Sequence, residues 1–290
     1  MQITASLVKE MRDRTGLGMM ECKKALVEAD GDIEAAIDTM RKSGAAKADK
    51  KAGRTAAEGA LAFAAAVDGR AAVLLEVNCE TDFVAKDENF TAFIGRLANL
   101  VLEQQPADIE ALKQLDLDGV PVEEARQQLV ARIGENIQLR RFVRRSSGAG
   151  LGHYLHGHRI GVLVEVEGGD EALWRDLAMH IAASAPLCVQ ESDIPAEVLE
   201  RERGIYFAQA AESGKPEDIQ AKMVEGKVRK FAAEQTLLGQ AFVKDPDTTV
   251  GKLLKQAGAQ VLGFDRLVVG EGIEKEEDDF VAEVMKQAKA

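Results

Sequence analysis

A strand-like motif occurs twice in this chain. Residues 70–77 read RAAVLLEV and residues 159–166 read RIGVLVEV, so five of the eight positions are identical. Each copy is a short apolar run of the kind that forms a buried strand, and an apolar pattern with helical spacing follows each copy. The repeat therefore restricts the fold to one that contains two related strand–helix units.

The two copies differ in the connection between strand and helix. The first connection is five residues longer and contains Thr81, Asp82, Phe83 and Val84, followed by Lys86. Loops can change without unfolding the core that supports them. We therefore expect the function of this duplicated scaffold to lie in the first connection. The other interpretation of Phe83, that it simply fills the core, stays open from the pattern alone.

The composition excludes several classes of protein. At 290 residues the chain is long enough for two or three domains. Its hydrophobic fraction of 46% and charged fraction of 30% are typical of a globular protein, and its few aromatic residues favour helix over an all-β fold. A net charge of −12 argues against a general nucleic-acid binder, which needs cations to neutralise phosphates.

The cysteines and the first residues indicate where the protein works. Cys22, Cys79 and Cys188 are far apart and form no CxxC pair, so we interpret them as reduced thiols. Residues 1–6 lack the features of a signal peptide, and no apolar run has the length of a membrane span. These patterns predict a cytoplasmic protein.

The first half of the chain divides into a helical unit, a linker and a core subdomain. Residues 1–43 show three short helical patterns, in which Met19 and Met20 are either core residues or an adaptable apolar contact for a partner. Residues 44–58 are basic and rich in alanine and glycine, which favours a solvated linker. Residues 59–145 hold the first repeat and end in a very basic run that is typical of an edge strand.

The second half holds the second repeat and a helical hairpin. We expect a second core subdomain over 146–270, with residues 194–238 inserted as two mostly polar helices joined by a turn. The only apolar stripe in the second of these helices is narrow and consists of Ile219, Met223 and Phe231. So thin a seam predicts a protruding antiparallel coiled coil. Residues 271–290 read as a C-terminal helix with acidic first turns and basic last turns.

Catalytic signatures are absent from the sequence. Three Gly-Lys pairs, at 214–215, 226–227 and 251–252, lack the serine or threonine that follows in a phosphate-binding P-loop. Residues 153–158 read HYLHGH, a spacing that matches no common zinc signature. We therefore predict no metal, no cofactor and no enzyme of covalent chemistry.

Several motifs, in order along the whole chain, resemble bacterial elongation factor Ts. They are residues 7–26 (LVKEMRDRTGLGMMECKKAL), 78–86 (NCETDFVAK), 132–136 (RIGEN), 154–157 (YLHG), 222–226 (KMVEG) and 269–275 (VGEGIEK). The resemblance implies an α+β protein with an N-terminal ubiquitin-associated-like three-helix unit and two related α+β subdomains. It also implies a coiled coil inserted in the second subdomain and a C-terminal helix.

The resemblance further implies a guanine-nucleotide exchange factor that binds elongation factor Tu, in its GDP-bound and nucleotide-free forms, and promotes GDP release. In the family, the segment here formed by Thr81, Asp82, Phe83 and Val84 disturbs the partner's magnesium and phosphate site. Other positions implied to contact the partner, or to support this segment, are Arg12, Met19, Met20 and Lys23 in the N-terminal unit, the C-terminal helix, and Ile133, Gly134 and His156.

Two points remain open at the level of sequence. A non-exchanging adaptor or chaperone would need only the three-helix unit and the coiled coil, and it would leave the long connection without a role. Self-association through the coiled coil is possible, whereas no direct contact with nucleic acid or membrane is expected.

Overall fold

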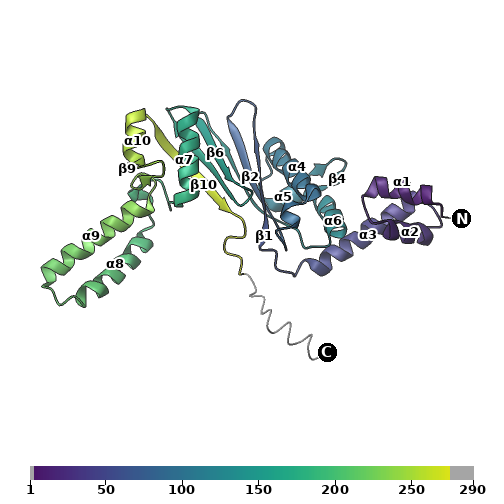
Figure 1. Ribbon diagram of the computed structural model, residues 1–290, viewed down its shortest axis with the longest axis horizontal. Coiled ribbons are helices and arrows are strands. Elements are labelled where there is room, and N and C mark those ends of the chain that lie inside the picture. The colour runs from purple at the N-terminus through teal and green to yellow at the C-terminus, as the bar shows by residue number, and fades with distance from the viewer. Residues whose placement is uncertain (1–2, 275–290) are drawn as a thin grey trace. The chain divides into compact units, whose positions relative to one another are not determined.

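The computed structural model describes residues 3–274 (Figure 1). Within that range the chain forms ten α-helices and ten β-strands, so the predicted α+β class is confirmed. The contacts divide the chain into two units. The first holds the described residues of 1–62, 75–142 and 269–290, and the second holds residues 63–74 and 143–268.

The first unit begins with a small bundle of three helices, α1 (Ala5–Thr15), α2 (Met19–Glu28) and α3 (Ile33–Lys51). The Thr4 hydroxyl caps α1 by accepting a 3.2 Å hydrogen bond from the Leu7 N–H. Gly16 ends α1 at a φ of +67°, a conformation that favours glycine. The core of the bundle consists of Val8, Met11, Cys22, Ala25, Leu26 and Ala36.

Helix α3 continues to Lys51, so the expectation of a solvated linker over 44–58 is wrong for its first half. Gly44 is buried, and a Cβ placed there would lie 3.6 Å from the Cβ of Ala131 in α6 (Val122–Ile133). The Lys51 ammonium donates a hydrogen bond to the carbonyl oxygen of Gly134. Packing against α6 therefore favours a helix in this basic segment. Such a tertiary contact cannot be predicted from the composition of the segment alone.

Strands β1 (Glu58–Ala65), β2 (Ala71–Cys79) and β5 (Gln138–Ser146) form one sheet in the order β1-β2-β5. The basic strand β5 lies at an edge of this sheet, as its sequence predicts. All three strands contribute residues to both units.

Helix α4 (Glu88–Gln104) follows β2 and provides the largest apolar face of the first unit. Its buried residues are Phe90, Phe93, Ile94, Leu97, Ala98 and Val101, which recur with helical spacing. After α4 come α5 (Ile109–Gln114), the two-residue strands β3 (Asp116–Leu117) and β4 (Val120–Pro121), and α6. Helix α6 ends at Gly134, which has a φ of +91°.

A second sheet lies in the second unit and contains β6 (Gly150–His156), β7 (Ile160–Glu167) and β10 (Gln260–Val268) in the order β10-β7-β6. All neighbouring pairs are antiparallel. Helix α7 (Glu171–Ser184) packs on this sheet through Leu177 and Ile181. A Cβ on Gly152 would lie 2.5 Å from the carbonyl oxygen of Trp174, so glycine allows α7 to approach β6 closely.

Helices α8 (Ala196–Ala211) and α9 (Glu217–Gln235) lie side by side as a hairpin (Figure 1). Their seam contains Ala210, Val224 and Val228, with Leu199 and Tyr206 partly buried against it. The predicted stripe is wrong in its position, because Ile219 is 41% exposed and the buried face lies one residue further round α9.

Short elements complete the described chain. They are the 3-10 turns η1 (Val84–Lys86) and η2 (Glu191–Asp193), the strands β8 (Ala241–Phe242) and β9 (Asp245–Thr249), and α10 (Val250–Ala257). The predicted C-terminal helix over 271–290 lies outside the described residues except for 271–274.

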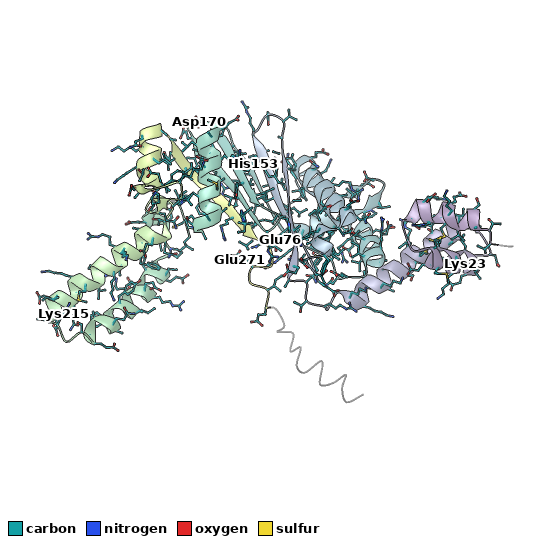
Figure 2. The ribbon with its side chains drawn as sticks, viewed as in Figure 1. Lys23, Glu76, His153, Asp170, Lys215 and Glu271 are labelled. Atoms are coloured by element: carbon teal, nitrogen blue, oxygen red, sulfur yellow. The ribbon has the colours of Figure 1, made fainter. Side chains whose placement is uncertain are left out.

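Glu76 is a fully buried carboxylate in the centre of β2, close to the described end of the chain (Figure 2). It accepts hydrogen bonds from Arg140 Nη1 at 2.8 Å, Arg141 Nε at 2.6 Å and the Gly270 N–H at 2.8 Å. Burial by itself raises the pKa of Glu76, but the Gly270 N–H and the two guanidinium groups outweigh it and lower the pKa. Arg141 also lies 3.5 Å from the carboxylate of Glu271.

Candidate functional site

The loop between β2 and α4 is the main difference between the two repeated units. Residues 80–87 connect strand and helix in the first copy, whereas residues 168–170 suffice between β7 and α7. Phe83 stands in this loop with 81% of its surface exposed, so the interpretation that it fills the core is wrong. A large apolar side chain held in water is a candidate contact for a partner.

Thr81 is held in place by hydrogen bonds to Glu135. The carboxylate of Glu135 accepts hydrogen bonds from the Glu80 N–H at 3.1 Å and the Thr81 N–H at 3.0 Å on one oxygen. Its other oxygen accepts a 2.7 Å hydrogen bond from the Thr81 hydroxyl. A charged acceptor that takes three hydrogen bonds holds this point of the backbone more firmly than a neutral acceptor does.

The loop beyond Thr81 folds into a tight turn. The Thr81 hydroxyl oxygen accepts a 3.4 Å hydrogen bond from the Val84 N–H, and the Phe83 carbonyl accepts one of 3.1 Å from the Lys86 N–H. The Val84 side chain is buried, and the Asp82 carboxylate lies 2.8 Å from the Lys86 ammonium. Phe83 therefore points outward from a turn whose neighbours on either side are anchored.

The segment after α6 supports the loop from the other side. The Glu80 carboxylate accepts a 2.6 Å hydrogen bond from the Asn136 N–H. The Asn136 side chain is buried and donates to the carbonyl oxygen of Arg54 at 2.7 Å. Gly134 turns the chain at the end of α6, and Ile133 before it is partly buried. The structure thus places Gly134 directly before Glu135, the residue that accepts the hydrogen bonds of Thr81.

Asp87 closes the loop by capping α4. Its carboxylate accepts hydrogen bonds from the N–H groups of Asn89 at 2.8 Å and Phe90 at 3.2 Å. Partial burial by itself raises the pKa of Asp87, but the hydrogen bonds from Asn89 and Phe90 outweigh it and lower the pKa. At neutral pH the cap is therefore a carboxylate that favours the helix N-terminus.

Cys79 is the last residue of β2, directly before the loop, and is fully buried. Its thiol contacts the Thr81 carbonyl oxygen at 3.2 Å. Burial, together with the negative charges of Glu135 and Glu58, raises the pKa of the Cys79 thiol to about 12. The thiol is therefore protonated at neutral pH and acts as a packing residue and not as a nucleophile.

The N-terminal residues implied by the resemblance lie at the surface of the three-helix bundle. Met19 is 59% exposed and Met20 is 76% exposed, so the interpretation that both fill the core is wrong. Lys23, one turn further along α2, is also exposed (Figure 2), as is Arg12 in α1. The surface of the bundle thus presents two flexible apolar side chains and two cations.

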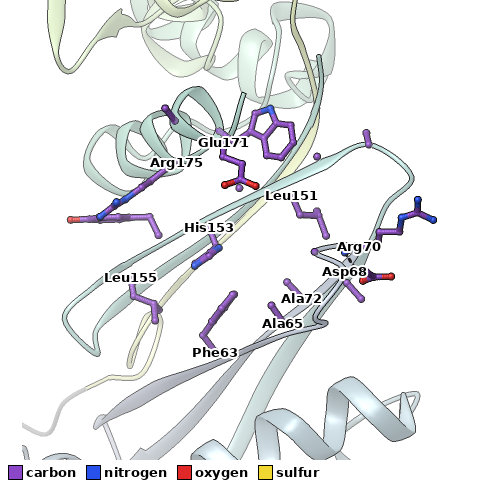
Figure 3. A pocket seen from close by; sticks show the side chains of 18 of the residues that line it. Phe63, Ala65, Asp68, Arg70, Ala72, Leu151, His153, Leu155, Glu171 and Arg175 are labelled. Atoms are coloured by element: carbon purple, nitrogen blue, oxygen red, sulfur yellow. Dashed lines mark hydrogen bonds between the residues drawn. The ribbon is translucent and has the colours of Figure 1, made fainter. Parts of the chain in front are cut away.

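His153 and His156 lie on β6 in the second unit. The ring of His153 stacks on Phe63 of β1 with 4.1 Å between centroids, and both face an open groove of about 1090 Å³ (Figure 3). Burial, and then the charge of Arg175, lowers the pKa of His153. His156 is exposed and lies 3.3 Å from the Tyr154 hydroxyl through its Nδ1. None of the described residues of the 80–87 loop lines this groove.

Reasoning from the sequence missed the supporting residues Glu135 and Glu76. Glu135 is separated from Thr81 by 54 positions, so no local pattern links the two. For Glu76 a signal existed, because a glutamate recurs inside both apolar runs, as Glu76 and Glu165. A charge kept inside a buried strand requires a partner.

The described residues show neither a metal-ligand cluster nor a membrane-spanning helix. Residues 3–274 contain no group of three or more histidine, cysteine, aspartate or glutamate side chains placed to hold a metal ion. No helix in this part of the chain is both long and apolar enough to cross a membrane.

Comparison with known proteins gives consistent results. Residues 80–271 match the family described as Elongation factor TS. The chain is 62% identical over 291 aligned positions to elongation factor Ts of Thioalkalivibrio sulfidiphilus. That alignment covers 100% of this chain and 99% of the other protein. It is 61% identical over 290 positions to elongation factor Ts of Alkalilimnicola ehrlichii and 56% identical over 292 positions to that of Methylococcus capsulatus. These alignments cover 100% of this chain and at least 99% of each relative.

Proposed function

Since this chain belongs to the elongation factor Ts family and is thereby a translation elongation factor, we propose that it binds elongation factor Tu and accelerates the release of GDP. The observation that carries the proposal is Phe83, an apolar side chain 81% exposed on an anchored loop that the second repeat lacks.

The proposed mechanism is linkage between two ligands of the same partner. A protein that binds the nucleotide-free partner more tightly than the GDP-bound partner must weaken GDP binding by the same factor. Burying the exposed Phe83 side chain in the complex would contribute about 1.5–3 kcal/mol toward that preference. No covalent bond forms or breaks, so the proposal requires no catalytic residue and no cofactor.

The four residues of the loop have different proposed parts. Phe83 enters the partner near its magnesium and phosphate site, and Asp82 brings a negative charge that disfavours the phosphates there. Val84 is buried and Thr81 is tied to Glu135. These two residues therefore act by holding the loop. Asp82 and Phe83 make the proposed direct contact with elongation factor Tu.

The N-terminal bundle provides a second proposed contact with the same partner. Met19 and Met20 can adapt their shape to a protein surface, and the exposed Arg12 and Lys23 add positive charge to the surface of the bundle. Ile133, Gly134 and His156 are weaker candidates, and Ile133 and Gly134 act in support of the loop. The C-terminal helix expected over 271–290 remains a proposed third contact.

The family membership also supports the finer architecture as a proposal. It consists of a ubiquitin-associated-like unit over 1–43, two core subdomains over 59–145 and 146–270, the coiled coil over 194–238, and the C-terminal module. Elongation takes place in the cytoplasm, where we place this protein. Elongation factor Tu is the proposed partner, with no direct nucleic-acid or membrane contact, and self-association through the coiled coil remains possible.

The test is release of labelled GDP from elongation factor Tu at fixed magnesium, with and without catalytic amounts of this protein. We expect a large acceleration that Phe83→Ala removes. A folded protein that binds elongation factor Tu without accelerating release would overturn the proposal and favour the adaptor function.

A further inference from the structure

Phe83 is 81% exposed, so its direction is set mainly by the backbone that carries it. The backbone on its C-terminal side is secured by the burial of Val84 and by the η1 turn. On the N-terminal side, Asp82 pairs with Lys86 through its side chain, and the partly buried Thr81 is held through its backbone N–H and its hydroxyl. Whatever holds Thr81 therefore contributes to the direction of Phe83.

One carboxylate accepts the hydrogen bonds from both the N–H and the hydroxyl of Thr81. Glu135 takes both backbone N–H groups of 80–81 on one oxygen and the Thr81 hydroxyl on the other. Because the hydroxyl hydrogen points to Glu135, the hydroxyl oxygen is free to accept from the Val84 N–H at 3.4 Å. A continuous series of hydrogen bonds thus runs from Glu135 through Thr81 to the residue after Phe83.

Glu135 itself stands on a rigid support. The residue before it, Gly134, has a φ of +91° and receives the Lys51 ammonium on its carbonyl oxygen. The residue after it, Asn136, is buried and donates its backbone N–H to the Glu80 carboxylate at 2.6 Å. The two segments are therefore joined reciprocally, since each supplies a carboxylate for a backbone N–H of the other.

We propose that Glu135 is a positioning residue for nucleotide exchange, which holds the loop in its partner-binding conformation before the partner arrives. The inference rests on the proposed function and adds a residue that does not itself touch the partner. A loop ordered in advance loses less conformational entropy on binding, so removal of the anchor weakens productive binding while Phe83 is still present.

The main variant is Glu135→Gln, which keeps the shape and removes the charge. An amide has one oxygen, so it cannot accept both the backbone N–H pair and the Thr81 hydroxyl. We expect the efficiency of GDP release to fall about tenfold, since a hydrogen bond to a charged group is lost with its geometry. Glu110→Gln, which removes a carboxylate that pairs with Lys113 on α5, is the matched control with unchanged exchange.

A second readout separates positioning from direct contact. In the free full-length protein, the amides of Glu80 and Thr81 should exchange with deuterium about tenfold faster in Glu135→Gln, because they lose their acceptor. Thr81→Val, which removes only the hydroxyl, should slow GDP release in the same way. In the double variant the two losses should not add, because both residues act through one series of hydrogen bonds.

The outcomes distinguish the inference from the proposed function. No acceleration of GDP release by the unaltered protein would sink the proposed function itself, whereas normal release by Phe83→Ala would sink only the role assigned to Phe83. Slow release by Phe83→Ala with normal release by Glu135→Gln would overturn only the positioning role. Slow release by Glu135→Gln with unchanged amide exchange would also overturn it, because Glu135 would then act by touching the partner. If Glu135→Gln fails to fold, Thr81→Val tests the positioning role instead, by the same measurements of GDP release and amide exchange.

Discussion

Glu76 and Glu165 occupy the same position of the repeated strand, and each carboxylate binds an arginine of β5. Glu76 is fully buried and binds Arg140 and Arg141, whereas Glu165 is 22% exposed and lies 3.4 Å from Arg145. The basic strand β5 thus does more than discourage edge-to-edge pairing, because it neutralises the charge that each repeat keeps within its sheet. The same residue type therefore contributes differently to the free energy of unfolding in the two units.

The difference in burial predicts unequal losses of stability. Glu76→Gln leaves two arginines without their buried anion, and we expect it to lower the free energy of unfolding by about 3 kcal/mol. Glu165→Gln removes a partly solvated pair and should cost about 1 kcal/mol or less. Chemical denaturation of both variants measures the difference. Equal losses would show that burial does not set the cost.

Exposure predicts that Phe83 can be removed without harm to the fold. Phe83→Ala should change the free energy of unfolding by less than about 0.5 kcal/mol, because its side chain is 81% exposed. GDP release from elongation factor Tu should nevertheless slow at least about tenfold, which corresponds to 1.4 kcal/mol. Stopped-flow release of labelled GDP, beside thermal unfolding, provides both values.

Phe90→Ala is the matched control, because Phe90 lies only seven positions away and is fully buried in α4. It should destabilise the protein by about 3–5 kcal/mol. A Phe83→Ala variant that loses as much stability as Phe90→Ala would contradict the assignment of Phe83 to the surface.

His180 predicts a pH dependence of stability in the second unit. The buried ring accepts a hydrogen bond from the Val243 N–H on Nδ1 at 3.2 Å, so its proton lies on Nε2, 3.0 Å from Gln240 Oε1. Burial lowers the pKa of His180, although the Gln240 hydrogen bond opposes this. The unfolded chain therefore takes up the proton first, and stability is complete above about pH 6.5 and falls as the pH decreases.

Nitrogen NMR of the histidine rings tests this directly. The His180 ring should remain in its neutral Nε2–H form at pH 6.5, and protonation should accompany loss of native signals. An imidazolium signal from His180 in the folded protein at that pH would contradict the prediction.

The three cysteines should differ in reactivity. Cys22 and Cys79 are buried, and the pKa of Cys79 is raised to about 12, so neither should react with iodoacetamide at pH 8. Cys188 is partly exposed. Burial, and then the charge of Asp193, raises its pKa, so it should react slowly but first. Mass spectrometry of tryptic peptides identifies the labelled site, and Cys188→Ser should abolish labelling of the folded protein. Early labelling of Cys79 would show that the loop above it opens.

The sequence predicts the elements that depend on local pattern. The repeated apolar runs become β2 and β7, and the helix after each is present. The length difference between their connections correctly identified an exposed loop. By contrast, the sequence pattern predicts a seam on Ile219, Met223 and Phe231, whereas Val224 and Val228 form the buried face of α9. Alanine and valine on a mostly polar helix give too weak a pattern to choose between neighbouring faces.

The residues that support the candidate site could not be predicted in the same way. Glu135 binds Thr81 across 54 positions, and Gly44 is buried because α6 covers it. Both contacts are set by tertiary packing, which overrides local preference. The sequence resemblance did include residues 132–136, but it assigned possible roles only to Ile133 and Gly134, and the acceptor of the three hydrogen bonds is their neighbour.

The hydrogen bond from Gly270 to Glu76 joins residues 194 positions apart. During synthesis on the ribosome, the strand that holds Glu76 emerges long before residue 270 exists. The core of the three-helix bundle uses only residues between Val8 and Ala36, so it can form soon after it emerges, whereas Glu76 receives its last partner only after residue 270 has been made. A factor that serves elongation thus completes its own first unit only after 194 further residues have been added to its own chain.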